Sequence, residues 1–293
     1  MISVIVPVYN EDKAIMNVLK DLVRVLAVFP KYEIIVVNDG STDRTLDVLK
    51  GAAIKDFKII DHAENLGYGK SLFDGMVSAQ YDCILIIDGD GTYPADRIAD
   101  LYKFYPKYDM VVGARQGAEF KHGLFKRPAR LFFQHLVQYA CGRKVPDVNS
   151  GMRIFSKHIV MKYQDSLCTG FSFTTTITLL FFLNHYYVKY VPIEYGKRLG
   201  RSKIKNVKDT LRAGQIIVGA FLYYNPIKLF LLIAFCNVLL GLGLAMVNGF
   251  FLKLSILTYT SALCIASFAP IFCIGLIADL LRKIFNINKA NKS

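Results

Sequence analysis

The sequence lacks several features that define common classes of protein. It has no tryptophan, and its six cysteines form no Cys-x-x-Cys pair and show no histidine spacing suited to zinc. We therefore expect the cysteines to be small buried hydrophobic residues in a reducing compartment. We also find no internal repeat, low-complexity segment or cleavable signal peptide, because Met1 leads directly into a strand-like run that reaches Pro7.

Acidic residues are in the minority. The 293 residues include 36 Lys and Arg against 23 Asp and Glu, which gives a formal net charge of +13 and a pI of about 9.4. A basic surface of this size suits nucleic acid, anionic lipid or phosphorylated small molecules. Nucleic acid fits least well, because the basic residues lie beside apolar stretches and form no recognised nucleic-acid motif.

Hydrophobic residues make up 53% of the chain, and their excess lies after Asn225. Residues 227–251 and 256–281 form two apolar runs, each long enough to cross a bilayer. The loop between them is short, whereas basic residues gather outside the pair: Arg198, Arg201, Lys203, Lys205, Lys208 and Arg212 before it, and Arg282, Lys283, Lys289 and Lys292 after it. The positive-inside rule predicts that both termini and the polar part of the chain are cytoplasmic. A buried helical hairpin in a soluble protein is the alternative.

The part before these runs alternates short apolar segments with helical patterns. The sequence predicts strands at residues 2–8, 33–37, 57–60, 84–87, 110–115 and 187–192. Two of the predicted helices are well marked. One has an apolar face made of Ile15, Val18, Leu19, Leu22, Val25 and Leu26, and the other is a buried helix at 169–183. Ser41 or Thr42 is expected to cap the helix after the second strand. This alternation predicts an α/β fold, a parallel sheet with helices on both faces and a ligand site at the carboxyl ends of its strands.

The fourth predicted strand ends in Asp88 and Asp90, each followed by glycine. Side chains at positions i and i+2 of an extended segment point to the same side, so the two carboxylates can converge. Converging hard oxygen ligands suit Mg²⁺ or Mn²⁺. An ordinary Asp-Gly turn is the alternative interpretation.

Residues 124–140 interleave basic residues with a broad Phe and Leu face. This pattern fits a helix in the membrane interface and equally a core helix with a solvated basic face. We divide the chain into a cytoplasmic catalytic domain at 1–205, an amphipathic juxtamembrane helix at 206–226 and a two-span region with a basic tail at 227–293.

Four motifs, each at a strand end, together closely resemble glycosyltransferase family 2, whose members have the GT-A fold with a Rossmann-like, mostly parallel sheet. They are residues 4–11 (VIVPVYNE), 36–43 (VVNDGSTD), 65–69 (NLGYG) and 88–90 (DGD). Residues 147–153 (DVNSGMR) and 198–203 (RLGRSK), followed by two spans, resemble the polyprenyl-phosphate branch typified by dolichol-phosphate mannose synthase. Processive synthases of the superfamily usually carry a Gln-x-x-Arg-Trp motif, which a chain without tryptophan cannot contain.

The resemblance implies a glycosyltransferase that moves one sugar from a nucleotide-diphosphate donor to the phosphate of an undecaprenyl or dolichyl lipid. The reaction is expected to be metal-dependent, with Mg²⁺ or Mn²⁺, and to invert the anomeric centre at the cytoplasmic face of the membrane. UDP is slightly favoured over GDP as the nucleotide, and the architecture is compatible with a homo-oligomer. The alternatives are a diacylglycerol or lipid-linked sugar acceptor, and a catalytically silent membrane scaffold.

The resemblance also assigns roles to individual residues. The donor-binding positions are Pro7, Val8, Tyr9, Glu11, Asn38, Asp39, Gly67, Asp88, Gly89 and Asp90, with Asp39 at the nucleobase. The metal ligands are Asp88, Asp90 and Thr92, the last where relatives often have Gln. The positions around the acceptor and the phosphates are Arg115, Arg127, Ser150, Arg153, Arg198, Ser202 and Lys203. The catalytic set is Asp88, Asp90, Arg115, Arg198 and Lys203.

Several of these positions also have a purely structural interpretation. Asp43 is expected to cap a helix rather than bind a ligand, and Gly67 to shape a turn or to let the backbone approach the donor. For each basic residue the alternative is attraction to anionic lipid. Some relatives carry a carboxylate near Thr174, Thr175 and Thr176, and the sequence leaves the effect of this difference open.

Overall fold

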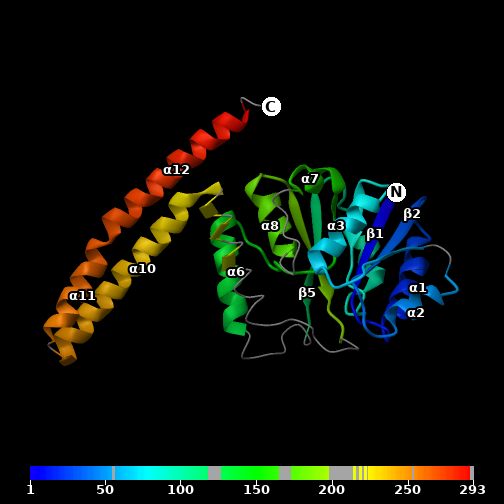
Figure 1. Ribbon diagram of the computed structural model, residues 1–293, viewed down its shortest axis with the longest axis horizontal. Coiled ribbons are helices and arrows are strands. Elements are labelled where there is room, and N and C mark those ends of the chain that lie inside the picture. Colours follow the sequence, from blue (N-terminus) through cyan, green and yellow to red (C-terminus); the bar gives the residue numbers. More distant parts are fainter. Residues whose placement is uncertain are drawn as a thin grey trace. The chain divides into compact units, whose positions relative to one another are not determined.

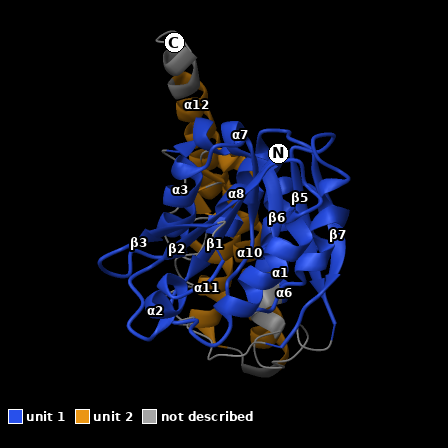
Figure 2. Cartoon of the chain, turned by 90° about the vertical axis from the view of Figure 1, so that its right-hand side faces the viewer, with its two compact units in different colours: residues 1–213 blue, residues 214–293 orange. Residues whose placement is uncertain are grey.

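The computed structural model forms two compact units, residues 1–213 and 214–293, which are drawn in Figures 1 and 2 and described separately. It describes residues 1–54, 57–117, 127–164, 173–197, 214–215, 218–219, 221–222, 224–252 and 254–290. The expected boundary at residue 205, and most of the expected juxtamembrane helix at 206–226, lie outside the described residues, so this division stays a prediction.

The first unit is built on a seven-stranded sheet in the order β3-β2-β1-β4-β6-β5-β7. Its strands are β1 (Ile2–Val8), β2 (Tyr32–Asn38), β3 (Phe57–Asp61), β4 (Cys83–Ile86), β5 (Met110–Gln116), β6 (Arg153–Ser156) and β7 (Val188–Glu194). The pairs β1–β2, β1–β4, β2–β3 and β5–β7 are parallel, whereas β6 pairs antiparallel with both β4 and β5. The expected mostly parallel sheet is therefore confirmed.

Alternation along the strands divides the apolar side chains between two cores. All seven residues of β1 are buried; Val4 and Val6 contribute to one core and Ile5 contributes to the other. Because successive side chains of a strand point to opposite faces, a continuous apolar run is the signature of a strand covered on both sides.

Helices cover both faces of this sheet (Figure 1). The first core packs against α1 (Ile15–Leu26), α2 (Thr45–Lys50) and α4 (Ile98–Tyr102), the last preceded by a 3₁₀ turn, η1 (Ala95–Arg97). The second core packs against α3 (Tyr68–Ser78), α7 (Lys157–Lys162) and α8 (Phe173–Leu183). The amphipathic face predicted for α1 is confirmed, although Val25 is only half-buried.

The helix α6 (Arg127–Cys141) packs against α8. It buries Val137 and Ala140 and exposes Leu131 and Tyr139, as an amphipathic helix does. The side chains at positions 127–130 are not described, so its insertion in a membrane interface stays a prediction.

The sequence did not predict the short strand β6, and one local expectation was wrong. Neither Ser41 nor Thr42 caps α2; Ser41 accepts a hydrogen bond from the Asn10 amide, and Thr42 bonds the Asn10 side chain. The capping carboxylate is Asp43, whose Oδ1 accepts from the Thr45 amide at 2.9 Å, as its alternative interpretation predicted.

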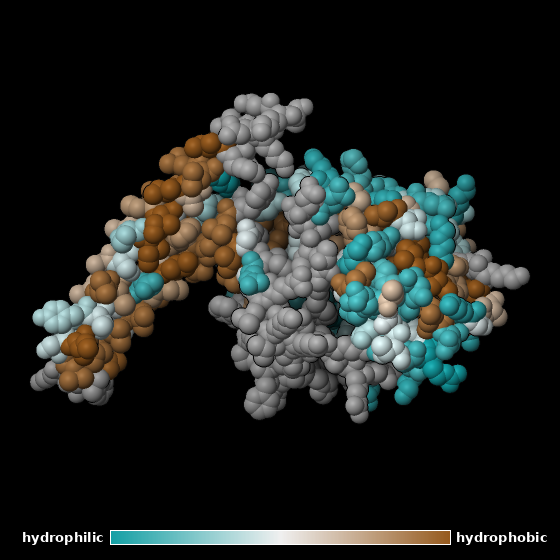
Figure 3. Space-filling view, in the orientation of Figure 1, coloured by the Kyte–Doolittle hydropathy of each residue, from teal (hydrophilic) through white to brown (hydrophobic). Residues whose placement is uncertain are grey.

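The second unit contains two helices long and apolar enough to cross a membrane, Pro226–Phe250 and Ser255–Ile284. The first consists of α10 (Pro226–Val247) and enters a π-helical turn, η4 (Asn248–Leu252). The second consists of α11 (Ser255–Ala266) and most of α12 (Phe268–Ala290). The sequence predicted this second span as one uninterrupted helix. Much of the visible surface of these helices is apolar (Figure 3), as lipid contact requires.

Small and polar residues hold these helices together. A β-carbon on Gly241 would lie 2.8 Å from the carbonyl oxygen of Ser261, and one on Gly275 would lie 2.7 Å from the Phe230 β-carbon. Close backbone approach at glycine is typical of helix packing in membranes.

The Asn225 side chain accepts from the Lys228 amide and so caps α10.

Candidate functional site

The turns that follow β1 and β2 interlock at the carboxyl edge of the sheet. The Asn10 amide donates to Ser41 Oγ at 2.9 Å, and the Glu11 amide donates to Thr45 Oγ1 at 2.8 Å. Glu11 is 7% exposed and Asn38 is 1% exposed, while the Asn38 amide group donates to Asp61 Oδ1 at 2.7 Å. These contacts fix the wall that the sequence assigned to the donor, beside Pro7, Val8 and Tyr9.

Asp39 lies at the end of β2, where its carboxylate receives hydrogen bonds from the next strand's turn. The Leu66 amide donates to Oδ1 and the Gly67 amide donates to Oδ2, each at 2.9 Å. Gly67 has φ +102°, a conformation that favours glycine, and it precedes the first turn of α3. The structure thus supports a conformational role for Gly67 and joins the 36–43 and 65–69 motifs at one carboxylate.

Asp90 is nearly buried, and its orientation is set by Thr92. The Thr92 hydroxyl donates to Asp90 Oδ1 at 2.6 Å, and the Thr92 amide donates to the same oxygen at 3.1 Å. Asp90 is 6% exposed and Thr92 is 1% exposed. Thr92 therefore holds Asp90 in place, and its own role as a metal ligand stays a prediction.

Asp88 is held by residues from two other parts of the chain. The Tyr68 hydroxyl donates to Asp88 Oδ1 at 2.8 Å. Burial, together with the neighbouring Asp88 carboxylate, raises the pKa of Tyr68 well above its ordinary value, so the hydroxyl keeps its proton. Gly151 lies against the same carboxylate, and a β-carbon there would overlap it.

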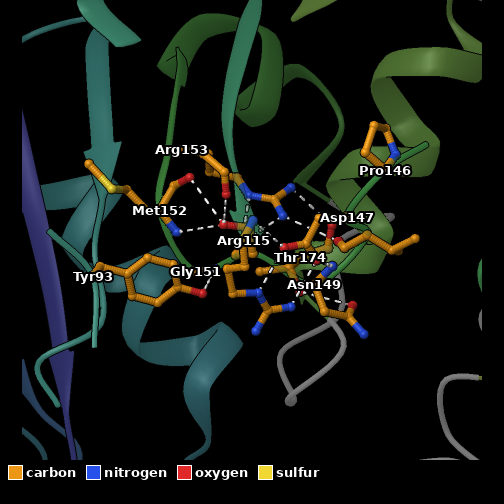
Figure 4. A network of polar contacts seen from close by, with 12 residues as sticks. Tyr93, Arg115, Pro146, Asp147, Asn149, Gly151, Met152, Arg153 and Thr174 are labelled. Carbon is orange, nitrogen blue, oxygen red and sulfur yellow. Dashed lines mark hydrogen bonds and ion pairs between the residues drawn. The ribbon is translucent and has the colours of Figure 1, made fainter. Parts of the chain in front are cut away.

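Tyr93 connects this turn to the loop that precedes β6. Its hydroxyl accepts a hydrogen bond from the Gly151 amide at 2.6 Å (Figure 4). Its ring packs edge-to-face on Tyr195, with the ring centres 5.3 Å apart. Burial raises the pKa of Tyr93, so this hydroxyl is neutral at physiological pH. The Asp-x-Asp turn and the 147–152 loop therefore form one connected structure.

Arg115 and Asp147 form a bidentate ion pair beside this network (Figure 4). Arg115 Nε and Nη2 lie 2.7 Å and 2.8 Å from the two Asp147 oxygens, and the Arg115 amide donates to Oδ2 at 3.1 Å. Burial alone would raise the pKa of Asp147, but the Arg115 charge and hydrogen bonds outweigh it and lower that pKa. The guanidinium also lies 5.4 Å from the centre of the Tyr195 ring.

Arg153 is fully buried and bonds to the interior of its own loop. Its guanidinium donates to the carbonyl oxygens of Val148, Ser150 and Thr174 at 2.7–3.2 Å and to Thr178 Oγ1 at 3.0 Å. Burial lowers its pKa from the usual value for arginine. Ser150 is equally buried, and its hydroxyl donates to the Gly113 carbonyl at 2.6 Å. Both side chains shape the loop, and their roles toward the acceptor stay predictions.

The neighbouring threonines complete this loop's support. The Thr175 hydroxyl donates to Asn149 Oδ1 at 2.7 Å, and the Thr178 hydroxyl donates to the Thr174 carbonyl at 2.7 Å. The hydroxyls of Thr175 and Thr178 therefore tie this end of α8 to the 147–153 loop, through Asn149 and the Val148 carbonyl.

Four of the predicted phosphate-binding residues cannot be placed. Arg198, Ser202 and Lys203 lie outside the described residues, and for Arg127 only the helical backbone is described. Their roles stay predictions. Sequence reasoning did not assign Tyr68, Tyr93, Gly151 or Asp147 to the site, although all four stand in or beside the quoted motifs.

The oxygen atoms of the Asp-x-Asp turn fit a small divalent cation. Two carboxylates and one hydroxyl provide hard ligands, and within the described ranges no group of three or more His, Cys, Asp and Glu forms a fuller metal cage. Mg²⁺ and Mn²⁺ suit such a partial set, because Mg²⁺ usually keeps waters and takes substrate phosphates as further ligands.

Comparison with known proteins agrees with this arrangement. Residues 3–164 match the sequence model of the family described as glycosyl transferase family 2. A dolichyl-phosphate beta-glucosyltransferase of Trichomonas vaginalis is 27% identical over 75% of this chain and 71% of its own length. A dolichyl-phosphate hexose transferase of Haloferax volcanii is 27% identical over 74% of this chain and 92% of its own length.

A third relative is matched over a shorter part. An undecaprenyl-phosphate 4-deoxy-4-formamido-L-arabinose transferase of Photorhabdus laumondii is 30% identical over 54% of this chain. The match spans half the length of that relative.

Solved structures confirm the fold class. Glucosyl-3-phosphoglycerate synthase of Mycobacterium tuberculosis, crystallised with Mn²⁺, UDP and glucosyl-3-phosphoglycerate, superposes with a TM-score of 0.60 at 17% identity, over 75% of this chain and 79% of that one. The same enzyme was also crystallised with Mg²⁺ and UDP. At this identity the likeness shows the GT-A fold, as the sequence predicted.

Proposed function

Because the chain belongs to glycosyl transferase family 2 and is a glycosyltransferase with two membrane-spanning helices, we propose that it transfers one sugar from a nucleotide-diphosphate donor to a polyprenyl phosphate. The observation that carries the proposal is the connected network that joins the Asp-x-Asp turn to the 147–153 loop. The names of its relatives, which act on dolichyl and undecaprenyl phosphates, support a lipid phosphate as the acceptor.

The donor would lie along the carboxyl edge of β1, β2 and β4. The nucleobase would contact Asp39, whose orientation is fixed by two backbone amides. A divalent cation held by Asp90 and Asp88, with Thr92 beside them, would supply the positive charge that a diphosphate leaving group needs. Because Thr92 and Tyr68 hold the two carboxylates, the turn needs little rearrangement when the donor arrives.

The acceptor phosphate would approach from the side of Arg115. This guanidinium is already positioned by Asp147, so it presents its charge at a fixed point. The acceptor is an anion and attacks without a strong general base, so proximity and charge neutralisation provide most of the acceleration. Attack from the face opposite the leaving group inverts the anomeric centre, so an α-linked donor yields a β-linked lipid phosphate sugar.

We further propose that the catalytic unit lies on the cytoplasmic side. Basic residues flank the two spans on the side of both termini, and the hairpin loop has few charges. A cytoplasmic site would meet nucleotide sugars, whereas the lipid phosphate would arrive from the bilayer.

Purified protein tests this function when UDP- and GDP-sugars are offered with undecaprenyl phosphate, dolichyl phosphate and diacylglycerol. We expect transfer to a polyprenyl phosphate that requires Mg²⁺ or Mn²⁺, and its loss in Asp90→Asn. Full metal-dependent transfer by Asp90→Asn would show that the site is assigned wrongly. Transfer only to diacylglycerol would contradict the acceptor class, and NMR showing a retained α linkage would contradict inversion.

A further inference from the structure

His62 lies between two carboxylates at the end of β3. Its Nδ1 is 2.9 Å from Asp39 Oδ1 and its Nε2 is 3.1 Å from Asp74 Oδ2. The His62 side chain is only 7% exposed, and its backbone amide donates to the Asn38 carbonyl at 2.9 Å. The ring is therefore held between β2, which carries Asp39, and α3, which carries Asp74.

The second contact fixes the ring on α3. Lys70 Nζ lies 2.5 Å from Asp74 Oδ1, so Asp74 is held by both Lys70 and His62. The adjacent carboxylate of Asp61 is engaged elsewhere, by the Asn38 amide group. With Nε2 directed at Asp74, Nδ1 of the same ring is directed at Asp39.

We propose that His62 is a positioning residue that fixes Asp39 and the 64–67 loop, and through them sets the affinity for the nucleotide of the donor. The proposal rests on the function proposed above. His62 does not touch the donor itself; it acts through Asp39.

The loop is attached to Asp39 in three ways. Its Leu66 and Gly67 amides donate to the two Asp39 oxygens, and His62 supplies the third hydrogen bond. A β-carbon on Gly40 would overlap the Glu64 backbone, so the loop also packs directly on the turn after β2. Without His62, Asp39 would lose the one side-chain hydrogen bond that is described for its carboxylate within the described ranges, and that carboxylate would be held by the two loop amides alone.

The positioning role is tested by nucleotide binding and steady-state kinetics. Removing one charge-assisted hydrogen bond should weaken binding of UDP or GDP about tenfold in His62→Ala and raise the donor KM in parallel. The acceptor KM, and kcat at saturating donor, should stay near the wild-type values. His62→Gln serves as a second variant should His62→Ala fold poorly.

Two control variants define the result. Asp74→Asn keeps the His62 to Asp39 hydrogen bond and should bind nucleotide nearly as the wild type does. His158→Gln replaces an exposed histidine on α7 and should change nothing. Wild-type nucleotide affinity in both His62 variants would overturn this inference alone, whereas wild-type protein that binds neither nucleotide would overturn the proposed function as well.

Discussion

Gly151 lies against the carboxylate of Asp88 so closely that a β-carbon on Gly151 would overlap both carboxylate oxygens. The two residues are far apart in the sequence and belong to different motifs. The Gly151 amide also donates to Tyr93, three residues beyond the Asp-x-Asp pair. The loop before β6 therefore forms part of the wall of the proposed donor site.

This contact predicts that Gly151→Ala reduces activity through displacement of Asp88. Misplacing a catalytic group by about 1 Å can cost about a hundredfold in rate, so we expect a loss of that order in kcat. Gly243→Ala is the matched control, because nothing lies within 4 Å of a β-carbon at that position. Equal activity in the two variants would show that Asp88 need not keep this position.

Tyr68→Phe should lower kcat/KM about tenfold, because Asp88 loses a neutral hydroxyl donor worth about 1.4 kcal/mol. Tyr105→Phe removes a similar hydroxyl that donates to Asp82 at 3.2 Å, outside the proposed site. We expect only the first variant to change turnover in a steady-state assay. A loss of the same size in both would point to general destabilisation.

The role of the Thr92 hydroxyl can be tested by replacing Thr92 with serine and with valine. Thr92→Ser keeps the hydroxyl that donates to Asp90 Oδ1, whereas Thr92→Val removes it at nearly constant volume. We expect Mn²⁺ binding in the presence of nucleotide, followed by electron paramagnetic resonance, to weaken about tenfold in Thr92→Val and to persist in Thr92→Ser. Unchanged binding in Thr92→Val would remove Thr92 from the metal site.

The Arg115–Asp147 pair makes stability depend on pH. The pKa of Asp147 is lower in the folded protein than in the unfolded chain, so its contribution is full above the unfolded value of about 4 and disappears as the pH falls through the folded value. Asp147→Asn leaves a largely buried guanidinium, whose side chain is 17% exposed, without its counter-charge and should cost about 3 kcal/mol near neutral pH. The difference should shrink below about pH 4.

Denaturant unfolding followed by tyrosine fluorescence checks this prediction, since the chain has 17 tyrosines and no tryptophan. Asp100→Asn is the control, because Asp100 forms ion pairs with Arg97 and Lys103 at the surface. Exposed pairs contribute little, so this variant should unfold like the wild type. If the difference in unfolding free energy between the wild type and Asp147→Asn grew toward acid, the pKa of Asp147 could not be lowered by folding.

Membrane orientation gives a further prediction. In a variant without native cysteines, Leu254→Cys near the hairpin loop should react with an impermeant thiol reagent added to intact cells. Lys50→Cys, at an exposed position in the catalytic unit, should react only after the cells are opened. The opposite labelling pattern would place the catalytic unit outside the cytoplasm.

The sequence predicted those elements whose physical signal is local. Continuous apolar runs identified β1, β2 and β4, because such runs are typical of strands buried on both faces. The carboxylates of Asp88 and Asp90 were found because they follow such a run directly. Periodic apolar residues likewise located α1.

The remaining features depend on contacts between distant residues. β6 begins with Arg153, whose burial is possible only because carbonyl oxygens from its own loop and from α8 surround the guanidinium. The hydrogen bond from Tyr68 to Asp88 joins residues from different motifs, and no pattern of one residue type marks it. The break at Ser267, between α11 and α12, also leaves mean hydropathy unchanged, because a single serine does not interrupt the apolar run.

Because β6 runs antiparallel to its neighbours, the chain brings residues to this site in two ways. Parallel strands such as β1, β2 and β4 bring only their outgoing turns to the carboxyl edge, each tied in length to the helix that follows. An antiparallel strand brings its incoming segment there instead, so residues 147–152 reach the donor turn before the chain enters β6. Because that entrance also packs on Asp88, a change of acceptor made through this loop has to keep glycine at position 151 if the donor turn is to stay in place.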